Sequence, residues 1–168
     1  MDLKVIEEKD FKNIIKIRFN NILEGLDNYD NIELSSLKNR KKDIEEDFIN
    51  ILESFFDLNE GKLIIDFYKK NLNEESINYI KSNLDIGDLE IFNELINECD
   101  NENIYYFIES KKYISLLIKL NTRELFFTTF YFYKYPLTIW GNYNFKFPMF
   151  YNEFSSIKKY MDILNKNK

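Results

Sequence analysis

One stretch of the chain limits its fold more than any other. Residues 123–151 read RELFFTTFYFYKYPLTIWGNYNFKFPMFY, and thirteen of these 29 positions are Phe, Tyr or Trp. Over residues 124–135 the rings separate into two alternating sets, as side chains do along a β-strand. The first set comprises Phe126, Phe130 and Phe132, and the second comprises Phe127, Tyr131, Tyr133 and Tyr135. We expect the first set to lie under helices, and the second, with its hydroxyl groups, to form the other face of a sheet.

Alternation of apolar and polar residues predicts further strands around this stretch. In YISLLIKL it places Ile114, Leu116, Ile118 and Leu120 on one face. Short turns such as NTR and GNYN separate the candidate strands. The strands expected are residues 103–110, 113–120, 124–134, 136–140 and 145–147. Together they predict an antiparallel meander of four or five strands.

Apolar residues spaced three and four apart predict helices elsewhere. The helices expected are residues 10–26, 35–55, 73–84, 88–99 and 152–164, and their expected N-caps are Asp10, Ser35 or Ser36, Asn73, Asp88 and Asn152. Residues 62–72 fit either a short helix or a strand, and we favour the helix. The predicted fold class is α+β, in which several N-terminal helices pack on one face of a four- to five-stranded antiparallel sheet and a helix ends the chain.

Charge divides the chain into two parts. Residues 1–100 carry 13 Lys or Arg against 24 Asp or Glu, whereas residues 101–168 carry 10 against 5. A Pro-, Gly- or Ser-rich linker is absent between them, so we expect residues 1–168 to form a single domain. Its expected parts are a mainly helical, acidic region (1–100), an aromatic-rich region of antiparallel strands (101–151) and a C-terminal helix (152–168).

The sequence contains no histidine. The usual general base and the commonest metal ligand are therefore missing, which excludes Ser-His-Asp, Cys-His and zinc-hydrolase chemistry. The four glycines are not grouped into a phosphate-binding loop, and nothing predicts a metal or another cofactor. The single cysteine, Cys99, excludes an internal disulfide, and its place on the apolar side of a helix predicts a buried, unreactive thiol.

Neither the start of the chain nor its hydropathy indicates a membrane. The first residues, MDLKVIEEKD, mix charges with apolar residues, so we expect neither a secretion signal nor an anchor. A membrane span requires about 18 uninterrupted apolar residues, and no stretch approaches that length. We expect a soluble, cytoplasmic protein.

Three glutamates form the most unusual pattern of charge. Glu90, Glu94 and Glu98 recur every four residues on the helix predicted over 88–99. Like charges at this spacing destabilise an isolated helix slightly. The row is interpreted either as an ordinary solvated face, as a contact for a basic protein, or as a metal site. A metal ion needs ligands that converge from several elements, which one straight row does not provide.

The predicted tyrosine face has three interpretations. It packs against the last helix or a loop, it docks a protein with Tyr131 and Tyr133 as anchors, or it stacks nucleic-acid bases. A sequence pI near 4.9 and only three arginines disfavour nucleic acid, whose binding depends on phosphate neutralisation. One of these arginines, Arg123, is either an anion anchor or half of a structural ion pair.

The acidic helical part, the block ELFFTTFYFYKYPLTIWGNYNFKFPMFY and the lack of catalytic groups give the chain the character of a known class. It resembles the small acidic immunity proteins that bacteria make against their own polymorphic or contact-dependent toxins. The resemblance implies a cytoplasmic, non-enzymatic protein that binds and inhibits a basic toxin domain, such as a nuclease. Charge complementarity would then speed association.

Two other classes of function stay open at this point. The first is a small enzyme that uses carboxylates or a tyrosine in a pocket between helices and sheet. A deep cleft with two converging carboxylates would favour it. The second is a structural or regulatory subunit that associates with itself through the tyrosine face.

Overall fold

A computed structural model describes residues 2–166 of the chain. Seven strands and seven helices, with two short 3₁₀ turns, alternate along these residues. In chain order they are β1 (Leu3–Ile6), α1 (Glu8–Ile14), α2 (Ile22–Asn28), β2 (Asp30–Leu34), α3 (Lys41–Leu58), β3 (Leu63–Asp66), η1 (Lys69–Asn71), α4 (Glu74–Ser82), α5 (Ile86–Glu98), β4 (Tyr105–Ile108), α6 (Lys111–Thr122), β5 (Thr129–Phe132), β6 (Leu137–Trp140), η2 (Tyr143–Phe145), β7 (Phe147–Tyr151) and α7 (Phe154–Lys166).

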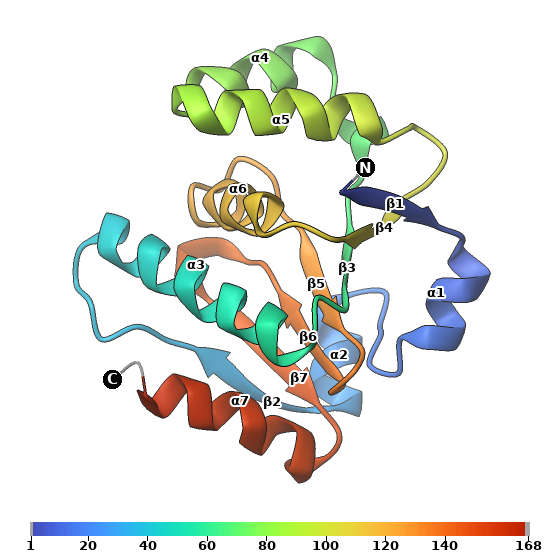
Figure 1. Cartoon of the computed structure of the whole chain (residues 1–168), viewed down its shortest axis with the longest axis vertical. Helices are drawn as coiled ribbons and strands as arrows, with labels where there is room; N and C mark the ends of the chain where they lie inside the picture. Colours follow the sequence, from blue (N-terminus) through green and yellow to red (C-terminus); the bar gives the residue numbers. More distant parts are fainter. Residues whose placement is uncertain (1, 167–168) are drawn as a thin grey trace.

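The strands form one antiparallel sheet in the order β1-β4-β3-β5-β6-β7-β2. Its middle contains the expected meander β5-β6-β7, with β5 hydrogen-bonded to β3. Both edges come from the first 34 residues, because β1 pairs with β4 and β2 pairs with β7 (Figure 1). The N-terminal segment therefore spans the sheet from one edge to the other.

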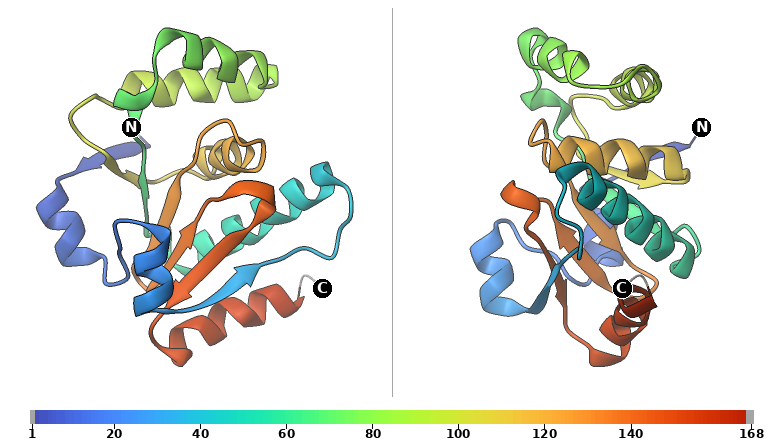
Figure 2. Two further views of the ribbon diagram at one scale, coloured as in Figure 1. Left: turned by 180° about the vertical axis from the view of Figure 1, so that it is seen from behind. Right: turned by 90° about the vertical axis from the view of Figure 1, so that its left-hand side faces the viewer.

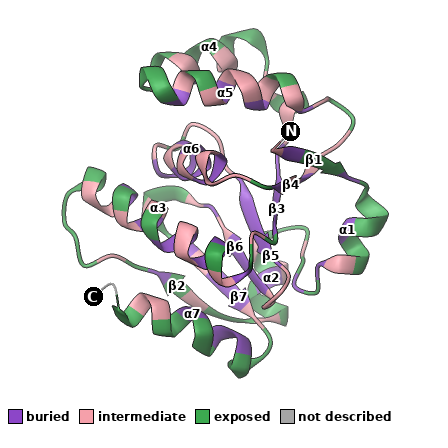
Figure 3. Ribbon diagram, in the orientation of Figure 1, coloured by how far each residue is buried: buried purple, intermediate pink, exposed green. Residues whose placement is uncertain are grey.

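The main hydrophobic core lies between the sheet and helices α3, α6 and α7, which cover one face, and α5 packs on α6 (Figure 2). Alternate strand residues point into it, including Leu63 and Ile65 from β3 and Phe130 and Phe132 from β5. Figure 3 shows the central strands β3, β5 and β6 and much of α6 as buried. We call this the helical face of the sheet.

The opposite face, here called the back face, carries a smaller core. Ile64 and Tyr131 from the sheet pack there against Ile6, Phe11 and Ile15 of the N-terminal segment. The segment between α1 and α2 crosses this face, and the carbonyl oxygen of residue 17 accepts a 2.6 Å hydrogen bond from the hydroxyl group of a β6 threonine. The predicted segregation of rings is confirmed for β5, since its phenylalanines face the helices and its tyrosine faces the other way.

The fold class is confirmed as α+β with an antiparallel sheet, but its details differ from the prediction. The sheet has seven strands rather than four or five, and the N-terminal segment supplies strands as well as helices. The predicted helix over 10–26 is wrong, because α1 ends at Ile14 and the chain then bends, outside any helix or strand, until α2 begins at Ile22. Helices also lie on both faces of the sheet, since α1 covers the back face.

The largest error concerns residues 113–120, which form helix α6 and not a strand. Packing explains why the pattern misled. This helix lies between α3, α5 and the sheet, so its apolar arc is wide, and Ile114, Leu116, Ile118 and Leu120 are all buried. These four residues alternate as they would on a strand, although Lys112, Ser115 and Lys119 also recur at the helical spacing of three and four residues.

Other local predictions had mixed outcomes. Residues 63–66 form strand β3, so the helix favoured over 62–72 is wrong. Helix α3 begins at Lys41 rather than near residue 35, and α5 begins two residues before Asp88. The Asn73 cap is confirmed, because its side-chain oxygen accepts a 2.8 Å hydrogen bond from the backbone N–H of Ser76. Within the described residues, none of the helices is both long enough and apolar enough to cross a membrane.

Candidate functional sites

Helices α4 and α5 form a strongly acidic unit at one end of the molecule (Figure 1). Residues 73–100, here called the acidic hairpin, contain eight Asp or Glu and a single basic residue, Lys81. Its exposed acids include Glu74, Glu75 and Glu90. Two large apolar side chains are also exposed on it, Tyr79 at 62% and Ile86 at 83%. The acidic hairpin thus combines negative charge with uncovered apolar surface.

The three glutamates singled out from the sequence do not have equal surroundings. Glu90 is exposed, and no described residue forms an ion pair with it. Glu94 accepts a 2.6 Å hydrogen bond from Lys112 of α6, which lowers the pKa of the Glu94 carboxyl group. Glu98 accepts a 3.2 Å hydrogen bond from the Tyr113 hydroxyl group. Two members of the row therefore hold α5 against α6, and Glu90 points to solvent.

The two tyrosines predicted as anchors lie on the back face beneath or beside α1. Tyr131 is only 5% exposed, and its ring meets the Phe11 ring edge-on with centroids 4.9 Å apart. Tyr133 is half-buried against Phe107. Of the three interpretations of this face, packing fits Tyr131, although the covering helix is the first and not the last. The expectation that Tyr131 presents its ring to a partner does not fit a ring that is already covered.

A cavity of about 400 Å³ opens on the back face, where β3 ends and β5 begins. We call it the Asp66 pocket, after the one carboxylate in its lining, and its walls include Tyr68, Tyr105, Tyr131 and Trp140. A second cavity of about 440 Å³ adjoins it and shares Phe19, Asn20, Tyr105 and Tyr131. Volumes of this size suit a small ligand or a single side chain.

Strand register explains why Asp66 is in this pocket. Residues two apart on a strand share a face, so Asp66 points to the same side as Ile64. Asp66 is 5% exposed. Its carboxylate accepts a 2.7 Å hydrogen bond from the Thr129 backbone N–H and a 3.3 Å hydrogen bond from the Tyr131 hydroxyl group. Within residues 2–166, no Lys or Arg pairs with it.

Burial dominates the electrostatics of this carboxyl group. It raises the pKa of Asp66 from 3.8 to about 6, although the hydrogen bonds from Thr129 and Tyr131 act in the opposite direction. Burial, followed by the charge of Asp66, raises the pKa of Tyr131 well above its ordinary value. Tyr131 is therefore a protonated donor near neutral pH, and Asp66 is largely ionised there without a cation beside it.

A side chain of α6 holds the backbone of Thr128, which lines the Asp66 pocket. The Asn121 side-chain oxygen accepts a 3.1 Å hydrogen bond from the Thr128 backbone N–H. A Cβ atom at Gly141 would lie only 1.8 Å from that oxygen, so the close approach of β6 requires glycine there. The Thr128 hydroxyl group is buried in this lining and has no hydrogen-bond partner among the described residues.

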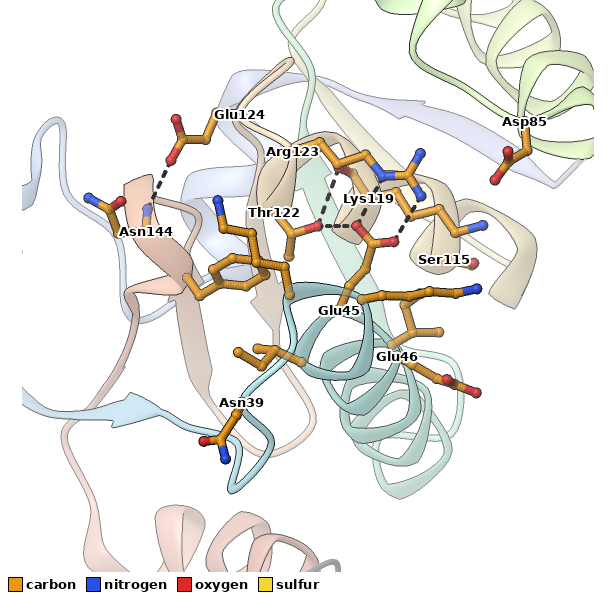
Figure 4. Close-up of a pocket in the computed structure, with 15 residues that line it drawn as sticks. Asn39, Glu45, Glu46, Asp85, Ser115, Lys119, Thr122, Arg123, Glu124 and Asn144 are labelled. Carbon is orange, nitrogen blue, oxygen red and sulfur yellow. Dashed lines mark hydrogen bonds and ion pairs between the residues drawn. The ribbon is translucent and has the colours of Figure 1, made fainter.

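A larger groove of about 1230 Å³ lies on the helical face, between α3, α6 and the start of α5. Figure 4 shows Glu45 reaching both Thr122 and Arg123. Glu45 accepts hydrogen bonds from Arg123 at 2.8 and 3.1 Å, and Arg123 also donates to the Asn83 carbonyl oxygen at 3.1 Å. Of the two roles considered for Arg123, the structural ion pair is the one observed. Its guanidinium group joins α3 and α6 to the loop between α4 and α5.

Asp88, expected as an N-cap, also belongs to an ion pair near this groove. Its carboxylate accepts hydrogen bonds of 2.7 and 2.8 Å from Lys119 of α6. The predicted burial of Cys99 is confirmed, and burial raises the pKa of its thiol to about 12. Within residues 2–166, no three Asp, Glu or Cys side chains come together as a metal site would require.

Comparison of the chain with protein-family models, with curated proteins and with solved structures finds no match. Function is therefore inferred from the geometry of the chain itself. The acidic hairpin and the Asp66 pocket each contain a carboxylate, Glu90 and Asp66 respectively, that pairs with no Lys or Arg of residues 2–166.

Proposed function

We propose that this chain is a non-enzymatic binding protein that docks onto a basic protein through the acidic hairpin. One observation carries the proposal: the hairpin contains eight acidic residues and only one basic residue, and its Glu74, Glu75 and Glu90 are all exposed. Lys112 and Lys119 of α6 offset Glu94 and Asp88, but they lie behind the hairpin rather than on its outer surface.

The surroundings of these charges suit a protein partner. Exposed carboxylates steer a basic protein towards the hairpin and speed the encounter. The exposed Tyr79 and Ile86 side chains then provide apolar contact area, since stable interfaces have apolar centres and tyrosine is enriched in them. Other large apolar side chains, such as Leu23, Leu37 and Phe154, are exposed outside the hairpin, so it is the combination with negative charge that supports a docking role.

The resemblance to immunity proteins gives this proposal its most specific form. In that form the chain is a bacterial cytoplasmic inhibitor, and its partner is a toxin domain with a basic cleft, such as a nuclease. An acidic surface suits such a cleft because it occupies the place of the phosphate groups that the nuclease binds. The charge and exposure of the hairpin support this form but are shared by other binders of basic proteins.

The alternative of an enzyme based on paired carboxylates has less support. A glycosidase-type reaction needs two carboxyl groups that face each other across the substrate. Among the described residues, Asp66 is the one carboxylate that lines its pocket, and Glu8 and Glu24 line the adjoining cavity together with Lys12, Lys16 and Arg18. Self-association through the tyrosine face would require Tyr131 to be uncovered, and it too stays a prediction.

The proposal is tested with two matched triple variants. The hairpin variant replaces Glu74, Glu75 and Glu90 with Gln. The control variant removes the same charge at three exposed acids elsewhere, Asp27→Asn, Glu33→Gln and Glu153→Gln. Circular dichroism melting verifies that both fold, which matters because Glu74 and Glu75 lie in the first turn of α4.

Affinity purification of the tagged native chain, followed by mass spectrometry, identifies the partner. We expect a basic protein that the hairpin variant fails to retain and the control variant retains. Stopped-flow measurements with the purified partner should then show association slowed about tenfold at low salt in the hairpin variant only. Equal binding by the two variants, or binding indifferent to salt, would contradict the proposal.

A further inference from the structure

The Asp66 pocket contains a buried carboxyl group that pairs with no Lys or Arg among residues 2–166, although Lys12, Lys16 and Arg18 line the adjoining cavity. An ionised carboxylate offers roughly four acceptor positions, and the Thr129 N–H and the Tyr131 hydroxyl group use two of them. Hydrogen bonding by the Thr129 hydroxyl group and by the Asp66 backbone also lowers the pKa of this carboxyl group. All of these donors are neutral. A buried carboxylate without a cation is costly, so its acceptors are suited to a donor that arrives from outside.

The walls of the pocket are aromatic. On one side Tyr105 and Tyr131 meet edge-to-face at 6.4 Å, and on the other Phe127 and Tyr143 meet in the same way at 4.7 Å. Trp140 lies in the same lining and is partly exposed. Aromatic faces attract cations through their quadrupoles and also pack against apolar groups.

The Thr128 hydroxyl group is a second unsatisfied polar group in this lining. Thr128 is buried to 2% exposure, and the neighbouring Gly141 and Asn121 hold its backbone in place. The Thr128 oxygen is shielded from solvent, so a ligand reaches it only if the lining moves. Asp66 is therefore the group on which binding in this pocket depends.

We propose that the Asp66 pocket binds a cationic N–H group on a short apolar stem, namely an alkylammonium or a guanidinium group. Asp66 accepts its hydrogen bonds, and the aromatic walls pack against its stem and attract its charge. Two sources share this chemistry: a free small amine or guanidine, and a Lys or Arg side chain of a protein.

Other ligand classes fit the pocket less well. An anion would be repelled by Asp66, and a neutral ligand would leave the buried charge unmatched. A hard metal ion takes six or more oxygen ligands, whereas the lining offers a single carboxylate. This inference does not depend on the acidic hairpin, whose exposed acids belong to α4 and α5.

Nuclear magnetic resonance titration of the full chain tests the proposal. The probes are methylguanidinium, butylammonium and, as an uncharged isostere of the first, methylurea. We expect both cations to shift the backbone amide resonances of Thr128 and Thr129 at millimolar concentration, and methylurea to leave them unchanged. Asp66→Asn should weaken cation binding at least about tenfold, because the amide keeps the shape but removes the charge.

Glu8→Gln is the matched control, since Glu8 lines the adjoining cavity and carries the same charge. We expect it to change the affinity much less than Asp66→Asn. The proposal is overturned if methylurea binds as well as methylguanidinium, if neither cation binds, or if Glu8→Gln weakens binding as much as Asp66→Asn. Melting of the Asp66→Asn variant shows that it folds.

Capped peptides identify the source of the cation. If the pocket takes a protein side chain, N-acetyl-glycyl-arginyl-glycinamide or its lysine counterpart should bind at least as tightly as the small cation of the same group. If it takes a free small molecule, the rim residues Asn20 and Asn142 should exclude the peptide backbone, and both peptides should bind more weakly. Either result is consistent with the class of ligand proposed.

Discussion

The two faces of the sheet differ in whether their buried carboxylates are paired with a cation. On the helical face, Glu45 and Asp88 are each buried beside a cation, Arg123 and Lys119 respectively. On the back face, Asp66 is buried to a similar degree and receives hydrogen bonds from neutral donors alone. The paired carboxylates join α3 and α5 to α6. Asp66 connects β3 to β5, but the backbone hydrogen bonds between these two strands already do so.

This difference indicates which region is devoted to structure and which is available for binding. Removing one partner of a buried ion pair leaves an uncompensated charge, so such pairs hold elements in place even when they add little net stability. A carboxylate that is already uncompensated has the opposite property, because the folded chain would be more stable without its charge. Stability measurements can therefore distinguish the two faces directly.

The largest effect is expected when the ion pair on the helical face is broken. Arg123→Met keeps much of the apolar stem but leaves Glu45 without its cation. We expect the free energy of unfolding to fall by about 2–4 kcal/mol, below the full cost for a deeply buried pair because Arg123 is partly exposed. Urea titration monitored by circular dichroism measures the change.

Lys41→Met serves as the control, since Lys41 is exposed in the same groove and forms no ion pair within residues 2–166. It should change stability by less than about 0.5 kcal/mol. Similar losses for Arg123→Met and Lys41→Met would mean that the Glu45 pair does not hold α3 to α6 as the geometry indicates.

Replacing Asp66 is expected to raise the free energy of unfolding, which is the opposite of the effect expected for Arg123. The folded state holds the Asp66 proton more tightly than the unfolded chain does, because its pKa is about 6 when folded and 3.8 ordinarily. This carboxyl group therefore lowers stability progressively as pH rises from about 4 to about 6, and by a constant amount above that range. Asp66→Asn removes the titration but keeps an oxygen for the Thr129 N–H.

We accordingly expect Asp66→Asn to raise the free energy of unfolding by roughly 1–3 kcal/mol at pH 8, and the gain to shrink towards zero at pH 4. Urea titrations of both proteins across this range provide the measurement. A variant that is less stable than the native chain at pH 8 would show that Asp66 is compensated after all. More stability together with lost cation binding would identify Asp66 as a binding group.

Parts of this contrast could be predicted from the sequence, and others could not. The phenylalanine side of β5, the Asn73 cap and the burial of Cys99 depend on local spacing, and all three agree with the structure. The two edge strands depend on pairings with distant partners. Charged or polar residues interrupt both of them (LKVI and DNIEL), and their pairing partners lie far along the chain, so β1 and β2 went unpredicted.

The Asp66 pocket was missed for a related reason. GKLIIDFYKK fits a helix or a strand equally well, and the helix interpretation gives Asp66 no relation to Tyr131. As a strand, its alternation places Asp66 on the face of Ile64, which pairs with Tyr131 across β3 and β5. An acidic residue that ends a run of buried strand residues was therefore the available signal. The cation partners of Glu45 and Asp88 involve distant residues of α6, and no local pattern indicates them.

The smallest effect concerns two buried threonine hydroxyl groups, those of Thr128 and Thr138. Thr138 donates a 2.6 Å hydrogen bond to the Ile17 carbonyl oxygen, whereas the Thr128 hydroxyl group has no described partner. Valine preserves the shape of both side chains. Thr138→Val should lower the free energy of unfolding by about 1–2 kcal/mol, because it leaves a buried carbonyl oxygen unpaired. Thr128→Val should leave it unchanged or raise it by up to about 1 kcal/mol, because no hydrogen bond is lost. Equal losses in the two variants, measured side by side in urea, would mean that Thr128 is satisfied in solution.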